Sequence, residues 1–147
     1  QQGGKLVFDG NYRPNLWPSV EEAQIAYLRT YEMTDIALPT LEDEALLFGL
    51  NTAEQVLQAI SNKGVLEVVV KMGADGCLAL HQGNVSFVEA EVVVPVDTTA
   101  AGDSFNAGYL AARFKGHSGV DACNAGHKLA SKVIQHRGAI IPNESSA

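Results

Sequence analysis

The sequence has little positive charge and little cysteine. Only 10 of its 147 residues are Lys or Arg, against 17 Asp and Glu, which gives a net charge of −7. Because no segment concentrates basic residues, the chain is not expected to bind nucleic acid or an anionic membrane. The two cysteines, Cys77 and Cys123, lie far apart with no second Cys or patterned His nearby. This spacing argues against a redox pair or a zinc site, and both are expected to be buried in a reducing compartment.

The sequence also lacks a long hydrophobic run, a repeat and a low-complexity segment. No apolar stretch approaches the ~20 residues that span a bilayer, and the N-terminus has no charged region followed by an apolar one. A cytoplasmic protein is therefore expected. The chain does not start with Met, and an apolar strand-like run begins as early as Lys5. We therefore expect it to be part of a longer protein.

What the sequence does have is an alternation of strand-like and helix-like segments. Short apolar or β-branched runs predict strands at residues 5–9, 35–38, 65–71, 77–81 and 85–88. The run at 65–71 is nearly all apolar and is expected in the middle of a sheet. The runs at 77–81 and 85–88 meet across Gln82-Gly83-Asn84, which predicts a hairpin. Residues 92–96 are interpreted as one more strand or as an extended segment.

Helices are expected between and after these strands. Ser19 and Glu22, like Thr52 and Gln55, have the spacing of capping boxes, with apolar residues at helical intervals behind them. The predicted helices cover residues 20–32, 42–48, 52–64, 102–116 and 120–135. The order is βαβαβ, then a hairpin, then two helices, which is typical of one α/β domain with a mainly parallel sheet.

The best candidate for chemistry is the segment Asp-Thr-Thr-Ala-Ala-Gly-Asp-Ser-Phe-Asn-Ala-Gly at residues 97–108. Ala100, Ala101 and Gly102 lie where a long helix begins, so N–H groups without intrahelical partners can bind an anion there. Such a site can stabilise a transferring phosphoryl group, and the Asp103 carboxylate can take the proton of an attacking hydroxyl. An ordinary helix start, whose Asp favours the helix dipole, explains the same residues about equally well.

Residues 97–108 resemble the second signature of the PfkB family, the ribokinase-like carbohydrate kinases. Many members have Gly where this chain has Ala100, although Ala also occurs there in ribokinases. The resemblance implies that Asp103 is the catalytic base and also contacts the substrate. It implies an anion hole made by the amides of Ala101, Gly102 and Asp103, with Ala100 also at the nucleotide. The residues implied to line a site for a monovalent cation, such as K⁺, are Asp97 and Thr99.

A glycine-containing turn, Lys71-Met72-Gly73-Ala74-Asp75-Gly76, follows the predicted central strand. Its glycines let the backbone approach a nucleotide closely, although most such turns are only turns. The turn resembles the Lys-x-Gly-x-x-Gly nucleotide turn of the family, which implies that Lys71, Gly73 and Gly76 contact ATP. His127 takes the place where relatives often have an Asn that contacts the nucleotide. Residues 135–139 resemble the closing segment of the family, which packs beside the nucleotide and the cation loop.

The segment Phe-Asp-Gly-Asn-Tyr-Arg-Pro-Asn-Leu-Trp at residues 8–17 indicates the substrate class. A strand-end Asp, Asn11 and Arg13 alternate and can face one ligand, and a guanidinium suits phosphate or carboxylate. A structural Arg packed over Trp17 is the alternative. Within the family the segment resembles kinases of 2-keto-3-deoxygluconate, which implies that Arg13 lies near the sugar acid and the transferred phosphate, with Asn11 at the nucleotide. Fructokinases and a deoxy-keto-gluconate kinase of inositol breakdown carry similar segments.

The acidic segment at residues 38–44, Leu-Pro-Thr-Leu-Glu-Asp-Glu, stands where many members have an Asn-x-x-Glu motif that arranges magnesium and phosphate. The Asn is absent here. Of the three acids we expect Glu44 to act on Mg²⁺ through water, because magnesium keeps much of its hydration. A solvated helix start is the alternative.

The resemblance covers residues 1–147 as the C-terminal half of a ribokinase-like fold, since family members are about twice this length. The other half normally supplies the first strands of the sheet, the lid and a Gly-Gly motif that grips the sugar, so an N-terminal half is the expected partner and a homo-oligomer is left open. The expected reaction transfers the γ-phosphate of ATP, with Mg²⁺, to the 6-hydroxyl of 2-keto-3-deoxygluconate. The alternatives are a kinase for fructose, ribose or a related keto-deoxy acid, and a non-catalytic nucleotide-binding fragment.

Overall fold

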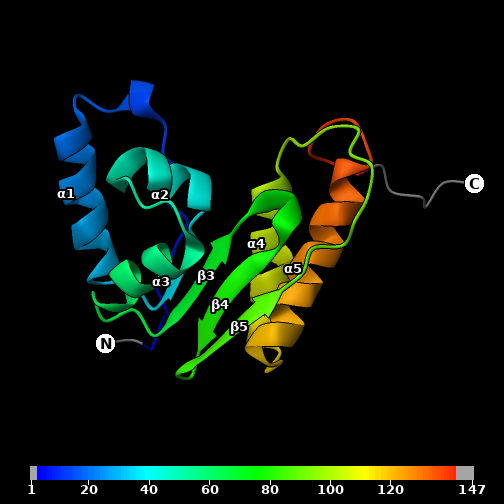
Figure 1. Ribbon diagram of the computed structural model, residues 1–147. Coiled ribbons are helices and arrows are strands. Elements are labelled where there is room, and N and C mark those ends of the chain that lie inside the picture. Colours follow the sequence, from blue (N-terminus) through cyan, green and yellow to red (C-terminus); the bar gives the residue numbers. More distant parts are fainter. Residues whose placement is uncertain (1–2, 142–147) are drawn as a thin grey trace, which may run out of the picture. The chain divides into compact units, whose positions relative to one another are not determined.

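The computed structural model describes residues 3–141 of the chain, shown in colour in Figure 1. The chain divides into two compact units, residues 1–88 and residues 89–147. Among the described residues, no helix has the length and apolar character needed to cross a bilayer. The expectation of one domain over residues 1–147 stays a prediction, and residues 1–2 and 142–147 lie outside the described part.

The first unit contains a five-stranded mixed sheet. Its strands, in sheet order, are β1 (Val7–Phe8), β2 (Ile36–Ala37), β3 (Glu67–Lys71), β4 (Cys77–His81) and β5 (Asn84–Val88). β1, β2 and β3 are parallel, whereas the hairpin β4–β5 joins β3 in antiparallel fashion. All five residues of β3 are buried. The central place of β3 confirms the prediction made from its run of β-branched residues.

Three helices and two short 3₁₀ turns connect these strands. They are α1 (Val20–Tyr31), α2 (Leu41–Phe48), α3 (Ala53–Ser61), η1 (Pro14–Leu16) and η2 (Gly73–Asp75). The side chains of Ser19 and Thr52 accept hydrogen bonds from amides of the first turns of α1 and α3, as the capping boxes predict. Thr40 caps α2 in the same way, which the sequence reading did not anticipate. The three N-caps explain where each helix begins.

The core of the first unit packs these helices against the sheet, with α1, α2 and α3 gathered beside the strands in Figure 1. Val68 and Val70 of β3 are fully buried in it. At the end of β1, the ring of Phe8 meets the rings of Tyr27 and Tyr31 edge-on, with centroids 5.3 Å apart in both pairs. Because two rings of α1 pack against Phe8, the backbone that leaves β1 is held against α1.

The second unit is built from α4 (Ala101–Phe114) and α5 (Gly119–Ile134), which lie side by side in Figure 1. Two glycines allow their close approach. A Cβ atom on Gly108 would lie 2.6 Å from the carbonyl oxygen of Ala125, and one on Gly126 would lie 2.8 Å from the ring of Phe105. Both distances are shorter than a Cβ contact allows, so the helix pair requires glycine at both positions.

Residues 92–96 form no strand. Val92 and Val94 are 96% and 85% exposed, and the amide of Val96 donates to the carbonyl oxygen of Ile134 at the end of α5. The strand alternative is therefore wrong. The alternating valines have the sequence pattern of a strand. Among the described residues, however, β5 is the last strand of the sheet, and no strand pairs with residues 92–96.

Candidate active site

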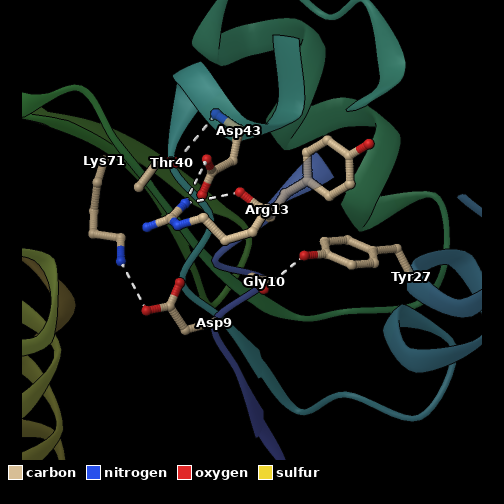
Figure 2. A network of polar contacts seen from close by, with 8 residues as sticks. Asp9, Gly10, Arg13, Tyr27, Thr40, Asp43 and Lys71 are labelled. Atoms are coloured by element: carbon tan, nitrogen blue, oxygen red, sulfur yellow. Dashed lines mark hydrogen bonds and ion pairs between the residues drawn. The ribbon is translucent and has the colours of Figure 1, made fainter. Parts of the chain in front are cut away.

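Asp9 and Lys71 meet at the carboxyl end of the parallel strands. Asp9 follows β1 and Lys71 ends β3, and the Lys71 Nζ atom lies 3.4 Å from Asp9 Oδ2 (Figure 2). The side chain of Lys71 is only 8% exposed, and that of Asp9 is 26% exposed. The amide of Lys71 donates to the carbonyl oxygen of Pro39, at the start of the loop after β2. A buried lysine paired with a carboxylate thus lies at the edge where open α/β sheets bind ligands.

Arg13 lies beside the N-terminal turn of α2. Its Nη1 atom donates to the carbonyl oxygen of Tyr12 at 2.8 Å and lies 3.5 Å from Asp43 Oδ1 (Figure 2). The side chain is 57% exposed, so the guanidinium is oriented but open to solvent. Trp17 packs edge-on against Tyr27, with ring centroids 6.0 Å apart. Arg13 therefore pairs with an acid of α2, and its packing over Trp17 stays an alternative interpretation.

The loop between Asp9 and Arg13 is tied to α1. The Tyr27 hydroxyl donates to the carbonyl oxygen of Gly10 at 2.6 Å, and a Cβ atom on Gly10 would lie 2.6 Å from the Tyr27 ring. Asn11 is exposed and adopts a left-handed backbone with φ of 47°. Gly10, Asn11 and Arg13 line a pocket of about 170 Å³ together with the rings of Trp17 and Tyr27. Burial, then the charge of Asp43, raises the pKa of Tyr27 to about 12, so its hydroxyl stays a donor.

Glu44 faces the core of the first unit. The Tyr31 hydroxyl donates to Glu44 Oε1 at 2.5 Å, and both residues are 2% exposed. Burial raises the pKa of the Glu44 carboxyl to about 7, although the hydrogen bond from Tyr31 acts in the opposite direction. A buried carboxyl of this kind does not fit a hydrated Mg²⁺ ion, which needs open water around it. We therefore assign no magnesium step to Glu44, and Asp43 is the acid of this turn that lies next to Arg13.

The turn after β3 depends on its glycines for its shape. Gly73 has φ of 58° and begins η2, and Gly76 has φ of 102° with ψ of −143°. The amide of Met72 donates to the carbonyl oxygen of Gly76 and closes the turn. Only glycine adopts the conformation of Gly76 without strain, so the shape of the turn is enough to explain why a glycine stands at this position. Contact of Gly73 and Gly76 with ATP stays a prediction.

In the second unit, the backbone turns sharply where α4 begins. Ala100 is left-handed, with φ of 60° and ψ of 20°, and its side chain gives α4 no cap. The amide of Ala101 donates to the carbonyl oxygen of Thr98 at 3.2 Å. The turn itself thus uses the Ala101 amide in this structure, and the expected contact of that amide with a phosphoryl group stays a prediction. The amides of Gly102 and Asp103 are the first-turn donors that have no carbonyl partner within the helix, and the Asp103 side chain is exposed beside them.

The carboxylate of Asp97 joins the loop before α4 to the segment after α5. Its Oδ1 atom accepts a hydrogen bond from the Thr99 amide, and its Oδ2 atom accepts one from the Gly138 amide, both at 2.9 Å. The hydrogen bonds from the Thr99 side chain and amide, and from Gly138, lower the pKa of Asp97 to about 2. These three donors leave one of the four lone-pair positions of the carboxylate open, so a charged Asp97 can also contact a cation here. No cluster of three or more His, Cys, Asp or Glu occurs in residues 3–141, so a bound ion would need other ligands as well.

His127 is packed inside the helix pair. It is 8% exposed, its ring meets the ring of Phe105 edge-on at 4.9 Å, and within the described residues its Nε2 atom has no hydrogen-bond partner. Contact with a nucleotide stays a prediction for this residue.

The sequence reading missed two pairings that the structure shows. It noted a strand-end Asp but did not connect Asp9 with Lys71, and it considered no acid as a partner for Arg13, which pairs with Asp43. A usable signal was present for the first pair, since both residues stand at the ends of predicted parallel strands, whose carboxyl ends share one edge.

Comparisons with known proteins show which family the chain resembles. The family model described as "pfkB family carbohydrate kinase" matches residues 1–146. A 2-dehydro-3-deoxygluconokinase of Escherichia coli (strain K12) is 53% identical over 97% of this chain and 48% of that protein. The chain thus spans about half the length of the curated relatives it matches.

Solved structures share the fold. A fructokinase from Vibrio cholerae O395, solved with fructose, ADP and calcium, matches with a TM-score of 0.84 and 29% identity, over 93% of this chain and 46% of that one. A double mutant of the same fructokinase, solved with fructose, ADP and potassium, matches with the same TM-score, identity and coverage. The family model, which matches nearly the whole chain, shows that the chain belongs to the pfkB family of carbohydrate kinases.

Proposed function

We propose that the complete protein that carries this chain is an ATP-dependent kinase of 2-keto-3-deoxygluconate, also called 2-dehydro-3-deoxygluconate. The observation that carries the proposal is the first turn of α4, where two amides without helix partners and the exposed carboxylate of Asp103 stand together behind the turn at Ala100. An arrangement of open amides and a carboxylate can bind phosphoryl oxygens and accept a proton.

The proposed step is an in-line phosphoryl transfer. The 6-hydroxyl of the sugar acid attacks the γ-phosphorus of ATP, the bond from that phosphorus to the bridging oxygen breaks, and ADP leaves. Asp103 takes the proton of the hydroxyl, and the amides of Gly102 and Asp103 hold the negative charge that develops on the phosphoryl oxygens. The product is 2-keto-3-deoxy-6-phosphogluconate.

The choice of sugar rests on Arg13 and on the name of a similar relative. Arg13 is oriented by Asp43 and remains more than half exposed, so its fork of donors is open to the carboxylate of a sugar acid or to the γ-phosphate. The 53% identity to a 2-dehydro-3-deoxygluconokinase favours the keto-deoxy acid over fructose, the sugar in the less similar solved structure. Asn11 is proposed to contact the nucleotide.

The remaining residues are proposed to hold the nucleotide and ions. Lys71 is proposed to place its positive charge next to the phosphates of ATP. The backbone at Gly73, Gly76 and Ala100 is proposed to approach ATP closely, and His127 is proposed to lie near the nucleotide. Asp97 and Thr99 are proposed to hold a monovalent cation such as K⁺. Magnesium, when bound with ATP, neutralises the phosphate charge. An ATP-dependent step of this kind favours a cytoplasmic location.

A coupled assay of ADP release tests the proposal on the complete protein. The substrates are 2-keto-3-deoxygluconate, fructose, ribose and a related keto-deoxy acid, with ATP alone as the background. We expect kcat/KM for 2-keto-3-deoxygluconate to exceed that for fructose and ribose by at least about a hundredfold, because these sugars lack the carboxylate and the loss of a charged contact costs several kcal/mol. The related keto-deoxy acid keeps the carboxylate and is expected to show a smaller difference. An equal or larger kcat/KM for fructose would reject the substrate. If none of the sugars raised ADP release above the background with ATP alone, the sugar-kinase activity itself would be rejected.

A further inference from the structure

We propose that Asp9 is a positioning residue for Lys71: its carboxylate holds the buried ammonium in the place where it receives a phosphate oxygen of the nucleotide. This inference rests on the proposed function, because it takes Lys71 as a nucleotide contact. The carrying observation is the pair itself, with Lys71 Nζ 3.4 Å from Asp9 Oδ2 and only 8% of the Lys71 side chain exposed (Figure 2).

The pair spans the end of a third strand. β1 and β3 lie on either side of β2, so their axes are roughly 10 Å apart. Lys71 can reach Asp9 only if its side chain extends over the carboxyl end of β2, where Pro39 also accepts the amide of Lys71. The carboxylate therefore selects one direction for a side chain that has four rotatable bonds.

The carboxylate of Asp9 stands on an anchored piece of backbone. The residue before it, Phe8, packs edge-on against the rings of Tyr27 and Tyr31. The residue after it, Gly10, accepts a hydrogen bond from the Tyr27 hydroxyl at 2.6 Å. Since both chain neighbours are fixed to α1, Asp9 is a rigid partner, as the positioning of a flexible lysine requires.

The charges of the pair give the second part of the argument. A buried ammonium without a counter-charge is costly, and the carboxylate of Asp9 offsets that cost before any nucleotide is bound. The pair of Arg13 and Asp43 differs, because the Arg13 side chain is 57% exposed and water stabilises its charge. Loss of Asp9 is therefore expected to disturb Lys71 much more than loss of an acid next to an exposed cation.

A double-mutant cycle tests this on the complete protein, with ATP as the probe and calorimetry as the measurement of its dissociation constant. Asp9→Asn keeps the size of the side chain and removes its charge. We expect it to weaken ATP binding about tenfold when Lys71 is present, and by less than about twofold when Lys71 has been replaced in Lys71→Met. The KM of the sugar is expected to stay within about twofold.

The control is Glu32→Gln, which removes the carboxylate from another lysine pair of the same unit, Lys63 and Glu32, whose Nζ and Oε1 atoms are 3.2 Å apart. It should leave ATP binding unchanged. If Asp9→Asn unfolds the protein in a thermal melt, Asp9→Glu, which keeps the charge but shifts it by one methylene, replaces it in the same cycle, and the same difference between the two Lys71 backgrounds is expected.

Three results would overturn the inference, and they differ in what they say about the function. Equal losses of ATP affinity in both Lys71 backgrounds would mean that Asp9 acts on the fold and not through Lys71. No loss from Asp9→Asn, with a clear loss from Lys71→Met, would reject the inference and leave the nucleotide role of Lys71 intact. Unchanged ATP binding in Lys71→Met would reject that nucleotide role and the inference with it.

Discussion

The hydroxyl of Tyr31 donates a hydrogen bond to Glu44 Oε1 across 2.5 Å in the core of the first unit, and so joins α1 to α2. Burial raises the pKa of Glu44 to about 7, from an ordinary value of 4.5. The folded state thus binds the proton more tightly than the unfolded chain does. The stability that protonated Glu44 contributes is complete below pH about 4.5 and is lost as the pH rises towards about 7.

Glu44→Gln should remove this pH dependence, because Gln keeps an oxygen for the Tyr31 hydroxyl and never ionises. At pH 8 we expect the free energy of unfolding of the variant to exceed that of the wild type by about 2 kcal/mol. Urea denaturation at pH 5 and pH 8 measures the difference. Glu42→Gln, at an exposed position in the same turn, is the control and should change stability by the same small amount at both pH values. An unchanged pH slope in Glu44→Gln would contradict this account.

The left-handed backbone of Ala100 predicts that a change to glycine, which usually destabilises a protein, stabilises this one. Ala100→Gly should raise the free energy of unfolding by about 0.5 kcal/mol, because glycine relieves the strain at φ of 60° by more than it loses in chain entropy. The neighbouring change Ala101→Gly, inside the first turn of α4, should lower it by about 0.5–1 kcal/mol. Chemical denaturation of both variants makes the comparison. A loss of stability in both would show that position 100 is not strained.

The close contact between α4 and α5 predicts that Gly108→Ala lowers stability, whereas helix propensity alone predicts that it raises stability. At an open helix position Gly→Ala stabilises by about 1 kcal/mol. Gly108→Ala should instead destabilise by about 1–3 kcal/mol, because the new Cβ atom would lie 2.6 Å from the carbonyl oxygen of Ala125, and backbone cannot move aside easily. Thermal melts report the sign, and a raised midpoint would contradict the helix packing described for the second unit.

The proposed cation site at Asp97 is tested by a titration with K⁺. Asp97→Asn keeps an oxygen for the Thr99 amide but removes the charge that a pKa of about 2 maintains at all ordinary pH values. The turnover of the complete wild-type protein should rise with K⁺, and that of the variant should respond little to it. The same response to K⁺ in both proteins would remove Asp97 from the proposed site.

The sequence predicted most of the fold because its signals are local. Ser19 and Thr52 determine where two helices begin, and the run that ends in Lys71 marks the central strand. The valines at 92–96 misled the reading for the same reason. Their alternation is a local pattern, whereas a strand also needs a neighbour, and here the backbone bonds to the end of α5.

The site was less accessible to the sequence, because its geometry depends on contacts between distant residues. Asp9 and Lys71 are 62 positions apart, and only the order of β1, β2 and β3 brings them together. The pairing of Arg13 with Asp43 likewise depends on which way the acids of α2 face, because Asp43 lies next to Arg13 whereas Glu44 is buried against Tyr31. The hydrogen bond from the Ala101 amide to the Thr98 carbonyl oxygen also depends on how the turn before α4 closes, which the sequence motif does not indicate.

The most direct test of the central claim compares Asp103→Asn with Asp121→Asn in the complete protein. Each Asp is the third residue of its helix and favours the helix dipole, and Asp121 also accepts a hydrogen bond from the Ser118 hydroxyl, but only Asp103 is proposed as the base. We measure turnover by ADP release and ATP affinity by calorimetry. The account predicts that Asp103→Asn lowers kcat by about 10²–10⁴-fold with ATP affinity retained, and that Asp121→Asn leaves kcat unchanged. A kcat for Asp103→Asn within a few-fold of the wild type would contradict it.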